Sequence, residues 1–390
     1  MKIEHTHDAF DLVCFSHLRW DFVFQRPQHL MSRFAKRMRV FFVEEAVFGA
    51  DNDHIIEEHS TENVKRVIPK LSGTHEASDV DKRLRTLLND YFTSAKIEHY
   101  LFWYYTPLAL AFSDHFTPDV VIYDCMDELS AFHFAPRHLK HFEQKLFDKA
   151  DIVFTGGFSL YEAKKHSHRN VYCFPSSIDK EHFIRARRVT EDPVDQKPIG
   201  RPRIGYFGVL DERFDNNLIA SIASSQPTWN FIMVGPVVKI DPSSLPHNDN
   251  IHYLGPKRYE ELPNYIAGWD IATIPFVLNG STRFISPTKT PEYLAAGKPV
   301  ISTAINDVVN PYGKKGLVHI IRSPEEFVQS AKEELEKGVE EKVEWLKEVD
   351  EFLALQSWDR TWQRMTQIIN AAVMTNVESR GNTLNGRINV

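Results

Sequence analysis

Short apolar runs alternate with helical patterns along the whole chain, and this alternation constrains the fold more than any other feature. Most runs are apolar on both faces, as the strands of a sheet covered on both sides must be. They occupy 10–16, 38–45, 99–105, 119–124, 151–156 and 170–175, and then 203–209, 229–236, 250–255, 270–275, 299–303 and 317–321. Between them lie helical stripes, such as Leu84, Leu88 and Phe92, and a capping-box pattern at Ser323–Glu326. The alternation predicts an α/β fold with doubly wound parallel sheets.

A charged segment with several prolines divides these runs into two similar sets. A chain of 390 residues is too long for one ordinary core, and Arg185–Arg203 has no helical or strand periodicity. We therefore expect two Rossmann-like domains that face each other across a cleft. Their predicted limits are 1–185 for the first domain, 186–203 for a linker, 204–356 for the second domain, 357–375 for a helix returning to the first domain, and 376–390 for a flexible tail.

Composition excludes several classes of function. The net charge of −7 argues against nucleic-acid binding. The N-terminus lacks a signal-peptide pattern, and no apolar run approaches the ~20 residues that span a bilayer. Cys14, Cys125 and Cys173 lie in or beside strand-like runs and are expected to be buried thiols. We predict a cytoplasmic protein without a metal site, and leave contact with the inner face of the membrane open.

The stretch Ser286–Thr303 places charged residues at the mouth of a predicted strand. Lys289 lies just before a short predicted helix, whose free N–H groups and dipole favour an anion such as phosphate. Glu292, in the first turn, is positioned to accept hydrogen bonds from two neighbouring hydroxyls, as on a ribose; alternatively, the helix dipole alone explains it. The stretch predicts a nucleotide-diphosphate pocket, with Ser286 and Thr288 as further binding candidates.

Two glycines and an arginine follow the first strand of the second half. The spacing of this segment does not match the dinucleotide fingerprint, but Gly205 and Gly208 allow a ligand to approach the backbone closely. Arg213 can bind a diphosphate with its two-pronged guanidinium, or can be a surface residue paired with a neighbouring aspartate, Asp211 or Asp215. Two further binding candidates, Gly235 and Lys257, follow the next two strands.

The second half resembles the nucleotide-sugar-binding half of GT-B glycosyltransferases, especially the large retaining family-4 group. The segment "PEYLAAGKPVIST" matches that family's glutamate, short helix, glycine and Pro-Val-Ile spacing, and 229–236, 250–276 and 173–183 match further stretches. The resemblance covers most of 150–375. It departs at Phe284, where the family commonly has a second glutamate that contacts the donor sugar. Lys289 resembles the lysine that holds the nucleotide phosphate in some bacterial exopolysaccharide transferases. The resemblance implies a UDP-sugar donor, no metal and no other cofactor.

The first half is similar, over Trp20–Glu45, to the N-terminal segment of bacterial teichuronic-acid-type transferases. This segment follows the first strand, so it lies at the carboxyl end of the predicted sheet, where ligands bind in open α/β folds. The candidate acceptor-binding residues are Trp20, Gln25, Arg26 and His29. Packing against the core is the alternative for His29.

Three carboxylates crowd the end of the strand-like run 119–124. Asp124, Asp127 and Glu128 are close in sequence, and like charges in contact raise one another's pKa, as acid–base chemistry requires. Sugar transfer needs a base or a group that stabilises positive charge at the sugar. Asp127 is the first candidate and Asp124 the second; the alternative is that either residue caps the helix that follows.

These features predict a bacterial cell-envelope glycosyltransferase. It would move a hexose-type sugar from a nucleotide diphosphate to a cell-surface polysaccharide or a lipid-linked acceptor. Two alternatives remain: a UDP-sugar epimerase of the same architecture, and a non-catalytic protein that binds nucleotide sugars, which Phe284 suggests.

Overall fold

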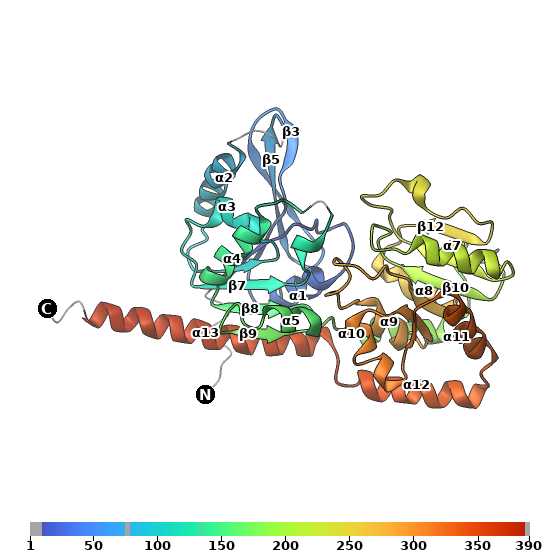
Figure 1. The fold of residues 1–390 in the computed structure, drawn as a ribbon. Coiled ribbons are helices and arrows are strands. Elements are labelled where there is room, and N and C mark those ends of the chain that lie inside the picture. The colour runs from blue at the N-terminus through green and yellow to red at the C-terminus, as the bar shows by residue number, and fades with distance from the viewer. Residues whose placement is uncertain (1–9, 75–78, 134, 387–390) are drawn as a thin grey trace. The chain divides into compact units, whose positions relative to one another are not determined.

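The computed structural model describes residues 10–74, 79–133 and 135–386, and the chain divides into two compact units. The first unit comprises Met1–Gly156, Leu160–Pro175 and Asp359–Val390. The second comprises Gly157–Ser159 and Ser176–Trp358. Each unit is built on its own sheet (Figure 1). The predicted fold class, with two parallel-sheet α/β domains, is confirmed.

The sheet of the first unit has the order β3-β5-β2-β1-β6-β7-β8-β9, and β4 pairs with β5. Its strands are β1 (Asp11–Phe15), β2 (Val40–Val43), β3 (Val47–Ala50), β4 (His54–His59), β5 (Lys65–Ser72), β6 (Tyr100–Tyr104), β7 (Val120–Cys125), β8 (Ile152–Thr155) and β9 (Val171–Cys173). All pairs are parallel except β4 with β5. The chain runs outward from β1 to β2 on one side and resumes at β6 on the other. The strand order therefore reverses between β1 and β6.

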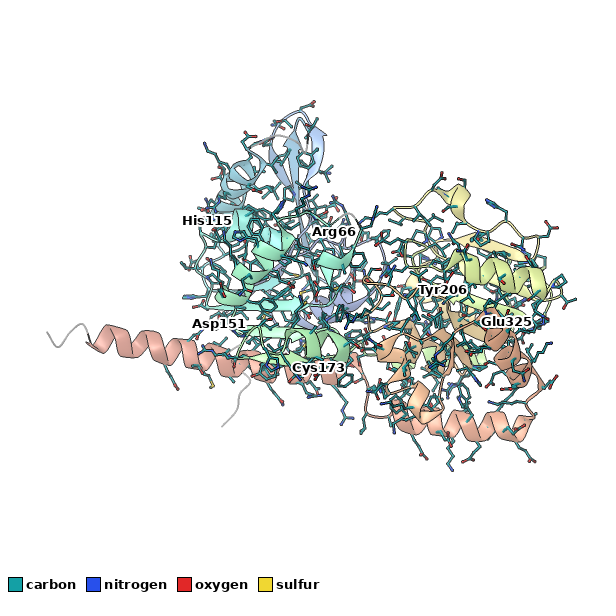
Figure 2. All side chains as sticks on the ribbon, in the orientation of Figure 1. Arg66, His115, Asp151, Cys173, Tyr206 and Glu325 are labelled. Carbon is teal, nitrogen blue, oxygen red and sulfur yellow. The ribbon has the colours of Figure 1, made fainter. Side chains whose placement is uncertain are left out.

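The strands β3, β4 and β5 were not predicted from the sequence. In β4, "HIIEEH" exposes most of its side chains to solvent, so it lacks the two-sided apolar run that marks the central strands. It forms an antiparallel pair with β5, which carries Arg66 (Figure 2). An antiparallel edge strand with one solvent-exposed face has only a weak hydrophobic pattern in the sequence. This explains why these strands were not predicted.

The helices of this part of the chain bury the predicted apolar stripes. They are α1 (Arg26–Phe34), α2 (Val80–Ser94), α3 (Leu110–Ser113), α4 (Leu139–Lys149) and α5 (Phe158–Lys164). In α2 the buried residues are Leu84, Leu88 and Phe92. In α4 they include Leu139 and Leu146. Both stripes are therefore core faces.

The long C-terminal helix, α13 (Trp358–Gly386), belongs to the first unit from Asp359 onward and runs along it (Figure 1). The Trp362 ring contacts Phe34 at a centroid distance of 5.8 Å. Further along, Asn376 Nδ2 donates to the Asp119 carbonyl (3.0 Å) and to Asp151 Oδ1 (3.2 Å). Among the described helices, none combines the length and the apolar character needed to cross a membrane.

The second unit has a parallel six-stranded sheet of order β12-β11-β10-β13-β14-β15. Its strands are β10 (Arg203–Phe207), β11 (Asn230–Val234), β12 (Ile251–Gly255), β13 (Ile271–Ile274), β14 (Val300–Thr303) and β15 (His319–Ile321). Its helices are α6 (Lys180–Ile184), α7 (Asn216–Ser225), α8 (Leu262–Ala267), α9 (Lys289–Ala295), α10 (Asn306–Val309), α11 (Pro324–Glu336) and α12 (Val339–Leu353). The strand order reverses between β10 and β13.

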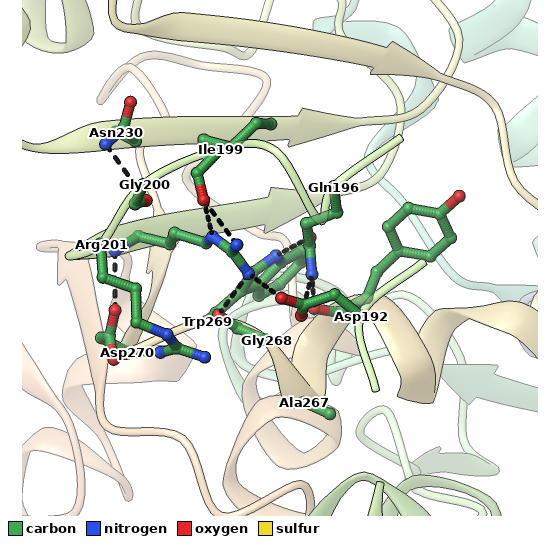
Figure 3. A network of polar contacts seen from close by, with 12 residues as sticks. Asp192, Gln196, Ile199, Gly200, Arg201, Asn230, Ala267, Gly268, Trp269 and Asp270 are labelled. Carbon is green, nitrogen blue, oxygen red and sulfur yellow. Dashed lines mark hydrogen bonds and ion pairs between the residues drawn. The ribbon is translucent and has the colours of Figure 1, made fainter. Parts of the chain in front are cut away.

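The segment expected to be a linker, 186–203, lies within the second unit. Gln196 is fully buried there and accepts a hydrogen bond from the Trp269 indole N–H (3.0 Å), as Figure 3 shows. Asp192 binds the Arg203 guanidinium (2.7 Å), and Arg187 binds Asp350 (2.7 Å). The segment has no periodicity because specific polar contacts, rather than an apolar stripe, hold it in place.

Candidate functional site

Two glycines lie against each other at the carboxyl edge of the second sheet, next to its switch point. Gly208 follows β10 and Gly235 follows β11, with φ angles of 142° and 149°. A Cβ on Gly235 would overlap the Gly208 carbonyl oxygen, so the two backbones pack directly on each other. Tyr206, on β10 (Figure 2), donates from its hydroxyl to the Val209 carbonyl (2.9 Å) and holds this turn. Glycine at both positions allows this close packing, and the backbone at Gly208 remains partly exposed at the strand end.

The Lys289 side chain lies against Gly208. A Cβ built on Gly208 would come 2.9 Å from Lys289 Nζ and closer still to its Cε. The Lys289 ammonium is 6.0 Å from the centroid of the Phe207 ring. Helix α9 is fixed to the sheet because the Tyr293 hydroxyl accepts the Phe207 N–H (2.8 Å). A positive charge beside open backbone at a strand end is an arrangement that suits a phosphate group.

Glu292, one turn into α9, is a buried carboxylate. Only 4% of its surface is exposed, and its Oε2 is buried with no hydrogen-bond partner among the described residues. Burial raises its pKa to about 7, Lys289 opposes this increase, and Asp179 adds to it. Buried polar atoms in native proteins normally have partners, so an unsatisfied carboxylate beside a cation indicates a ligand that donates hydrogen bonds.

Arg213, the other predicted diphosphate contact, binds a neighbouring carboxylate. Its Nε and Nη2 donate to the two oxygens of Asp211 at 2.9 and 2.6 Å. Asp215 instead caps α7 by accepting the Leu218 N–H (2.9 Å). The sequence left two interpretations of Arg213 open, a diphosphate contact or an ion pair with a neighbouring aspartate. The structure shows the ion pair, with Asp211.

The remaining predicted contacts of the second unit lie around this site with roles of their own. Lys257 follows β12, and its ammonium binds Asp195 (2.6 Å) and lies over the Tyr265 ring. The Ser286 carbonyl accepts from Ser176 Oγ (2.5 Å), and Thr288 immediately precedes α9. The structure thus joins Gly208, Gly235, Lys289 and Glu292 in one place, and holds Lys257 by a separate ion pair.

In the first unit, Arg26 and Asp124 form a buried ion pair. Arg26 Nε and Nη2 donate to the Asp124 carboxylate at 2.9 and 2.8 Å, and Nη1 donates to the Phe174 carbonyl (2.8 Å). Their exposed fractions are 4% and 0%. Burial raises the pKa of Asp124, and the guanidinium opposes that rise. Arg26 and Asp124, predicted as an acceptor contact and as a catalytic carboxylate, therefore neutralise each other inside the core.

Of the other acceptor candidates of the first unit, Trp20 and His29 are buried and Gln25 is partly exposed. Trp20 is buried against Phe42, at a centroid distance of 5.1 Å. Gln25 precedes α1, and its N–H bonds the Gln28 side chain (3.1 Å). His29 is buried, and its ring packs on Phe24 at 4.7 Å. These residues shape the segment before α1, and for His29 the packing alternative matches its position.

Two of the three carboxylates predicted to crowd after β7 are held by cations in the structure. Glu128 binds Lys164 (2.7 Å); burial alone would raise its pKa, but hydrogen bonds from Lys164 and Ser130 outweigh burial and lower it. Asp124 is turned to Arg26. Asp127 lies half-buried, two residues past the carboxyl end of β7.

Two residues of the site were missed at the sequence level. Tyr293 anchors α9 to β10, and Asp179 lies close enough to Glu292 to raise its pKa. Tyr293 follows Glu292 directly in the charged stretch, which was a usable signal. Asp179 is far away in sequence, and no local pattern connects it to α9.

One family model matches the part of the chain that contains Gly208, Gly235, Lys289 and Glu292. Residues 201–337 match the family model described as Glycosyl transferases group 1. TuaH of Bacillus subtilis strain 168, to which a role as a teichuronic acid biosynthesis glycosyltransferase is provisionally assigned, is 27% identical over 228 residues. This match covers 54% of the present chain and 57% of TuaH, so the chain spans little more than half the length of this curated relative.

Solved structures share the fold over nearly the whole chain. Sucrose-phosphate synthase from Thermosynechococcus elongatus has a TM-score of 0.68 at 13% identity, covering 94% of this chain and 100% of its own. Anabaena HepE in complex with UDP and glucose has a TM-score of 0.65 at 12% identity, covering 93% and 100%. An Escherichia coli trehalose-6-phosphate structure bound with UDP-2-fluoro glucose has a TM-score of 0.66 at 10% identity. The match covers 93% of this chain and 99% of that structure. The chain therefore has a GT-B type fold, and its second unit is similar to group 1 glycosyl transferases.

Proposed function

We propose that the chain is a glycosyltransferase that moves a sugar from a nucleotide-diphosphate donor, a UDP-sugar, to a hydroxyl of a saccharide or lipid-linked acceptor. Two observations support the proposal together. The Lys289 side chain lies against the Gly208 backbone, and Glu292 Oε2 is buried without a hydrogen-bond partner among the described residues. A nucleotide diphosphate is complementary to both groups. Its phosphates carry negative charge, and its ribose carries two hydroxyl donors.

In this proposal Lys289 holds the diphosphate and Glu292 accepts from the ribose hydroxyls. The family-model match includes both residues, and the HepE and trehalose-6-phosphate structures contain UDP or a UDP-sugar analogue. The leaving diphosphate gains negative charge as the sugar departs, and a preorganised cation at that place stabilises the transition state. Because Lys289 supplies such a charge, we propose transfer that does not depend on a metal.

The chemical step needs a group near the acceptor hydroxyl. The hydroxyl oxygen forms a bond to the anomeric carbon, the bond to the diphosphate oxygen breaks, and the hydroxyl proton passes to a base or to the leaving group. We propose Asp127 as the base or as the carboxylate that stabilises positive charge on the sugar. Its position at the carboxyl end of β7 supports this role, because ligands of open α/β sheets bind at that edge.

A labelled-donor experiment tests the proposal. Purified protein is incubated with UDP-sugars labelled in the sugar and with a bacterial acceptor extract. We expect label to move to the acceptor. Label remaining on UDP in a changed sugar would identify an epimerase, and donor binding without turnover would identify a binding protein; either result would overturn the proposal.

Matched variants locate the activity in the site. Removing one charged contact costs about 1.5–3 kcal/mol, so Lys289→Ala is expected to weaken UDP affinity roughly tenfold to a hundredfold, as measured by calorimetry. Lys332→Ala, an exposed lysine on α11, is the control and should bind UDP like the unmodified protein. Equal affinity in both variants would show that the diphosphate binds elsewhere.

A further inference from the structure

A cavity of about 350 Å³ lies in the second unit, at the amino edge of its sheet. Its lining includes Arg201 just before β10, Asp270 just before β13 and Pro299 just before β14. Much of the rest of the lining comes from the end of α11 and from α12. Gly208 and Gly235 follow strands at the opposite, carboxyl edge of the same sheet. The cavity is therefore a separate place from the candidate donor site.

One wall of this cavity is apolar. It contains Val339 and Val343 on α12, whose exposed fractions are 79% and 62%, together with Trp345 and Leu346 of the same helix. Val339 and Val343 are four residues apart, so they lie on the same face of α12. Trp269 is a further aromatic residue of the lining. A cavity of this size with aromatic and aliphatic walls is typical of small-molecule sites.

The charged residues of the lining are mainly basic. Four are cations and two are carboxylates: Arg201, Lys298, Lys337 and Lys342, and Asp270 and Glu334. Asp270 is bound by Arg201, a pair that Figure 3 shows. Glu334 is bound by His319 and Lys337. The glutamates of α12 are not part of the lining. Four cations against two carboxylates give the lining a net charge of +2, which favours an anionic occupant.

Lys298 is a partly buried cation of this lining. Its Nζ donates to the carbonyl oxygens of Ala267 (2.9 Å) and Trp269 (2.7 Å). Burial lowers its pKa to about 8, so at neutral pH the side chain is still mainly an ammonium. An ammonium has three N–H donors, and the described part of the chain engages two of them. The third donor suits the anionic group of a ligand.

Trp269 connects the cavity with the candidate donor site. Its ring lies against those of Tyr293 and Phe207, at centroid distances of 5.9 and 6.5 Å. Tyr293 and Phe207 share the hydrogen bond that holds α9 on the sheet. Lys289 begins α9, and Lys298 comes shortly after its end. The seven residues of α9 span about 10 Å, so the cavity and Lys289 lie at opposite ends of one short helix.

We infer that this cavity binds a small organic anion with a flat apolar body, and that its occupant tightens UDP binding from the far end of α9. The apolar wall takes the body of the ligand, and Lys298 and the exposed Lys342 take its anionic group. An occupant packed on Trp269 restricts the motion of Tyr293 and Phe207, so less ordering of α9 remains to accompany UDP binding. The second half of the inference rests on the proposed donor site, and the first half does not.

Calorimetry with naphthalene-1-acetate and naphthalene-1-acetamide tests the site. The two probes share one apolar body and differ in the carboxylate, so the acetate should bind about tenfold more tightly than the amide. Val343→Glu places a carboxylate on the exposed part of the apolar wall and should abolish acetate binding. Leu355→Glu, the same charge change at a residue that is 73% exposed and outside the lining, is the control and should keep it. Equal affinity for both probes, or acetate binding unchanged in Val343→Glu, would overturn the inference.

The same probe tests the link to the donor site. Saturating naphthalene-1-acetate should raise UDP affinity about fivefold, and UDP should raise the affinity for the acetate by the same factor, because coupling between two sites is reciprocal. In Val343→Glu, UDP affinity should equal that of the unmodified protein and should not respond to the acetate. UDP affinity that falls or stays the same when the acetate is added to the unmodified protein would overturn the link.

A second copy of the chain is the alternative cover for Val339 and Val343, and sedimentation over a range of protein concentrations tests it. A dimer that Val343→Glu dissociates, in a protein that does not bind the acetate, would overturn the inference. The two proposals also fail separately, because acetate binding needs no nucleotide. Acetate binding in a protein that does not bind UDP would contradict the donor proposal and the link, and would leave the cavity site. UDP binding in a protein that does not bind the acetate would overturn the cavity site and leave the donor proposal.

Discussion

Lys289 lies so close to Gly208 that no side chain fits between them: a Cβ on Gly208 would approach Lys289 Nζ to 2.9 Å. The two residues come from different elements, since Gly208 follows β10 and Lys289 begins α9. The Tyr293 hydroxyl, bonded to the Phe207 N–H, fixes the spacing between these elements. The absence of a side chain at position 208 is therefore what allows the ammonium to lie at the end of the strand.

Replacing Gly208 should displace this ammonium. In Gly208→Ala the new methyl group would overlap the Lys289 chain, and φ of 142° is unfavourable for any residue with a Cβ. We expect UDP affinity to fall about tenfold, as after loss of one charge-assisted contact. Calorimetry with UDP measures the effect. The control is Gly280→Ala, where the added Cβ meets no atom within 4 Å among the described residues. UDP binding unchanged in Gly208→Ala would show that Lys289 does not need its present position.

The pKa of Glu292 predicts how stability changes with pH. Burial raises this pKa to about 7, above the value near 4.5 of an unfolded chain. The folded state then holds a proton that the unfolded state has released, so the contribution is complete below about pH 4.5 and is lost as pH rises through 7. We expect the melting temperature of the ligand-free protein to fall between pH 5 and 8 more steeply than that of Glu292→Gln. Parallel pH profiles for the two proteins would contradict the assignment.

UDP binding should show the opposite trend, since the ionised carboxylate is the better acceptor for ribose hydroxyls. UDP affinity is expected to rise between pH 6 and 8 in the unmodified protein. The terminal phosphate of UDP also titrates, with a pKa of about 6. In Glu292→Gln only this phosphate titrates, so the pH dependence of UDP affinity in that variant is the contribution of the phosphate alone. The difference between the two curves isolates Glu292.

Breaking the Arg26–Asp124 pair should lower the stability of the fold and leave the rate of sugar transfer per folded molecule unchanged. Removing one partner of a buried ion pair typically costs 3–5 kcal/mol, because the other charge stays buried. We expect Asp124→Leu to lower the thermal unfolding temperature clearly, and Arg26→Met combined with Asp124→Leu to restore much of it. UDP affinity should not change in either protein. A loss of turnover with normal thermal unfolding would instead make Asp124 catalytic.

Asp127 is predicted to act in the chemical step and not in donor binding. A positioned base or electrostatic stabiliser is worth ~10²–10⁴ in rate, so Asp127→Asn should reduce turnover by that factor and leave UDP affinity nearly unchanged. Turnover with labelled donor and calorimetry with UDP are the two measurements. Full activity in Asp127→Asn would show that the Asp127 carboxylate takes no part in the chemical step.

Local patterns in the sequence were sufficient to predict the central strands and several helix ends. All of the apolar runs identified at the start correspond to strands, because a sheet covered on both faces needs hydrophobic residues on both sides. Ser323 begins α11 as expected, and its hydroxyl accepts the Glu326 N–H (3.3 Å). The α9 stretch was predictable for the same reason: Lys289, Glu292 and Gly297 lie within one local motif.

Contacts between distant residues could not be predicted. Arg26 and Asp124 are 98 positions apart, and nothing local to either residue indicates which charge meets which. The loop residues Arg213 and Asp211 are neighbours, yet the choice between Asp211 and Asp215 depends on the path of the loop. The edge strand β3 was not recognised either, because its side chains are only partly buried.

A crystal structure of the protein with UDP tests the donor site most directly. We expect the diphosphate within hydrogen-bonding distance of Lys289 Nζ, next to the backbone of Gly208, and the ribose hydroxyls donating to the Glu292 carboxylate. A diphosphate bound away from Lys289, with Glu292 Oε2 still lacking a donor, would contradict it.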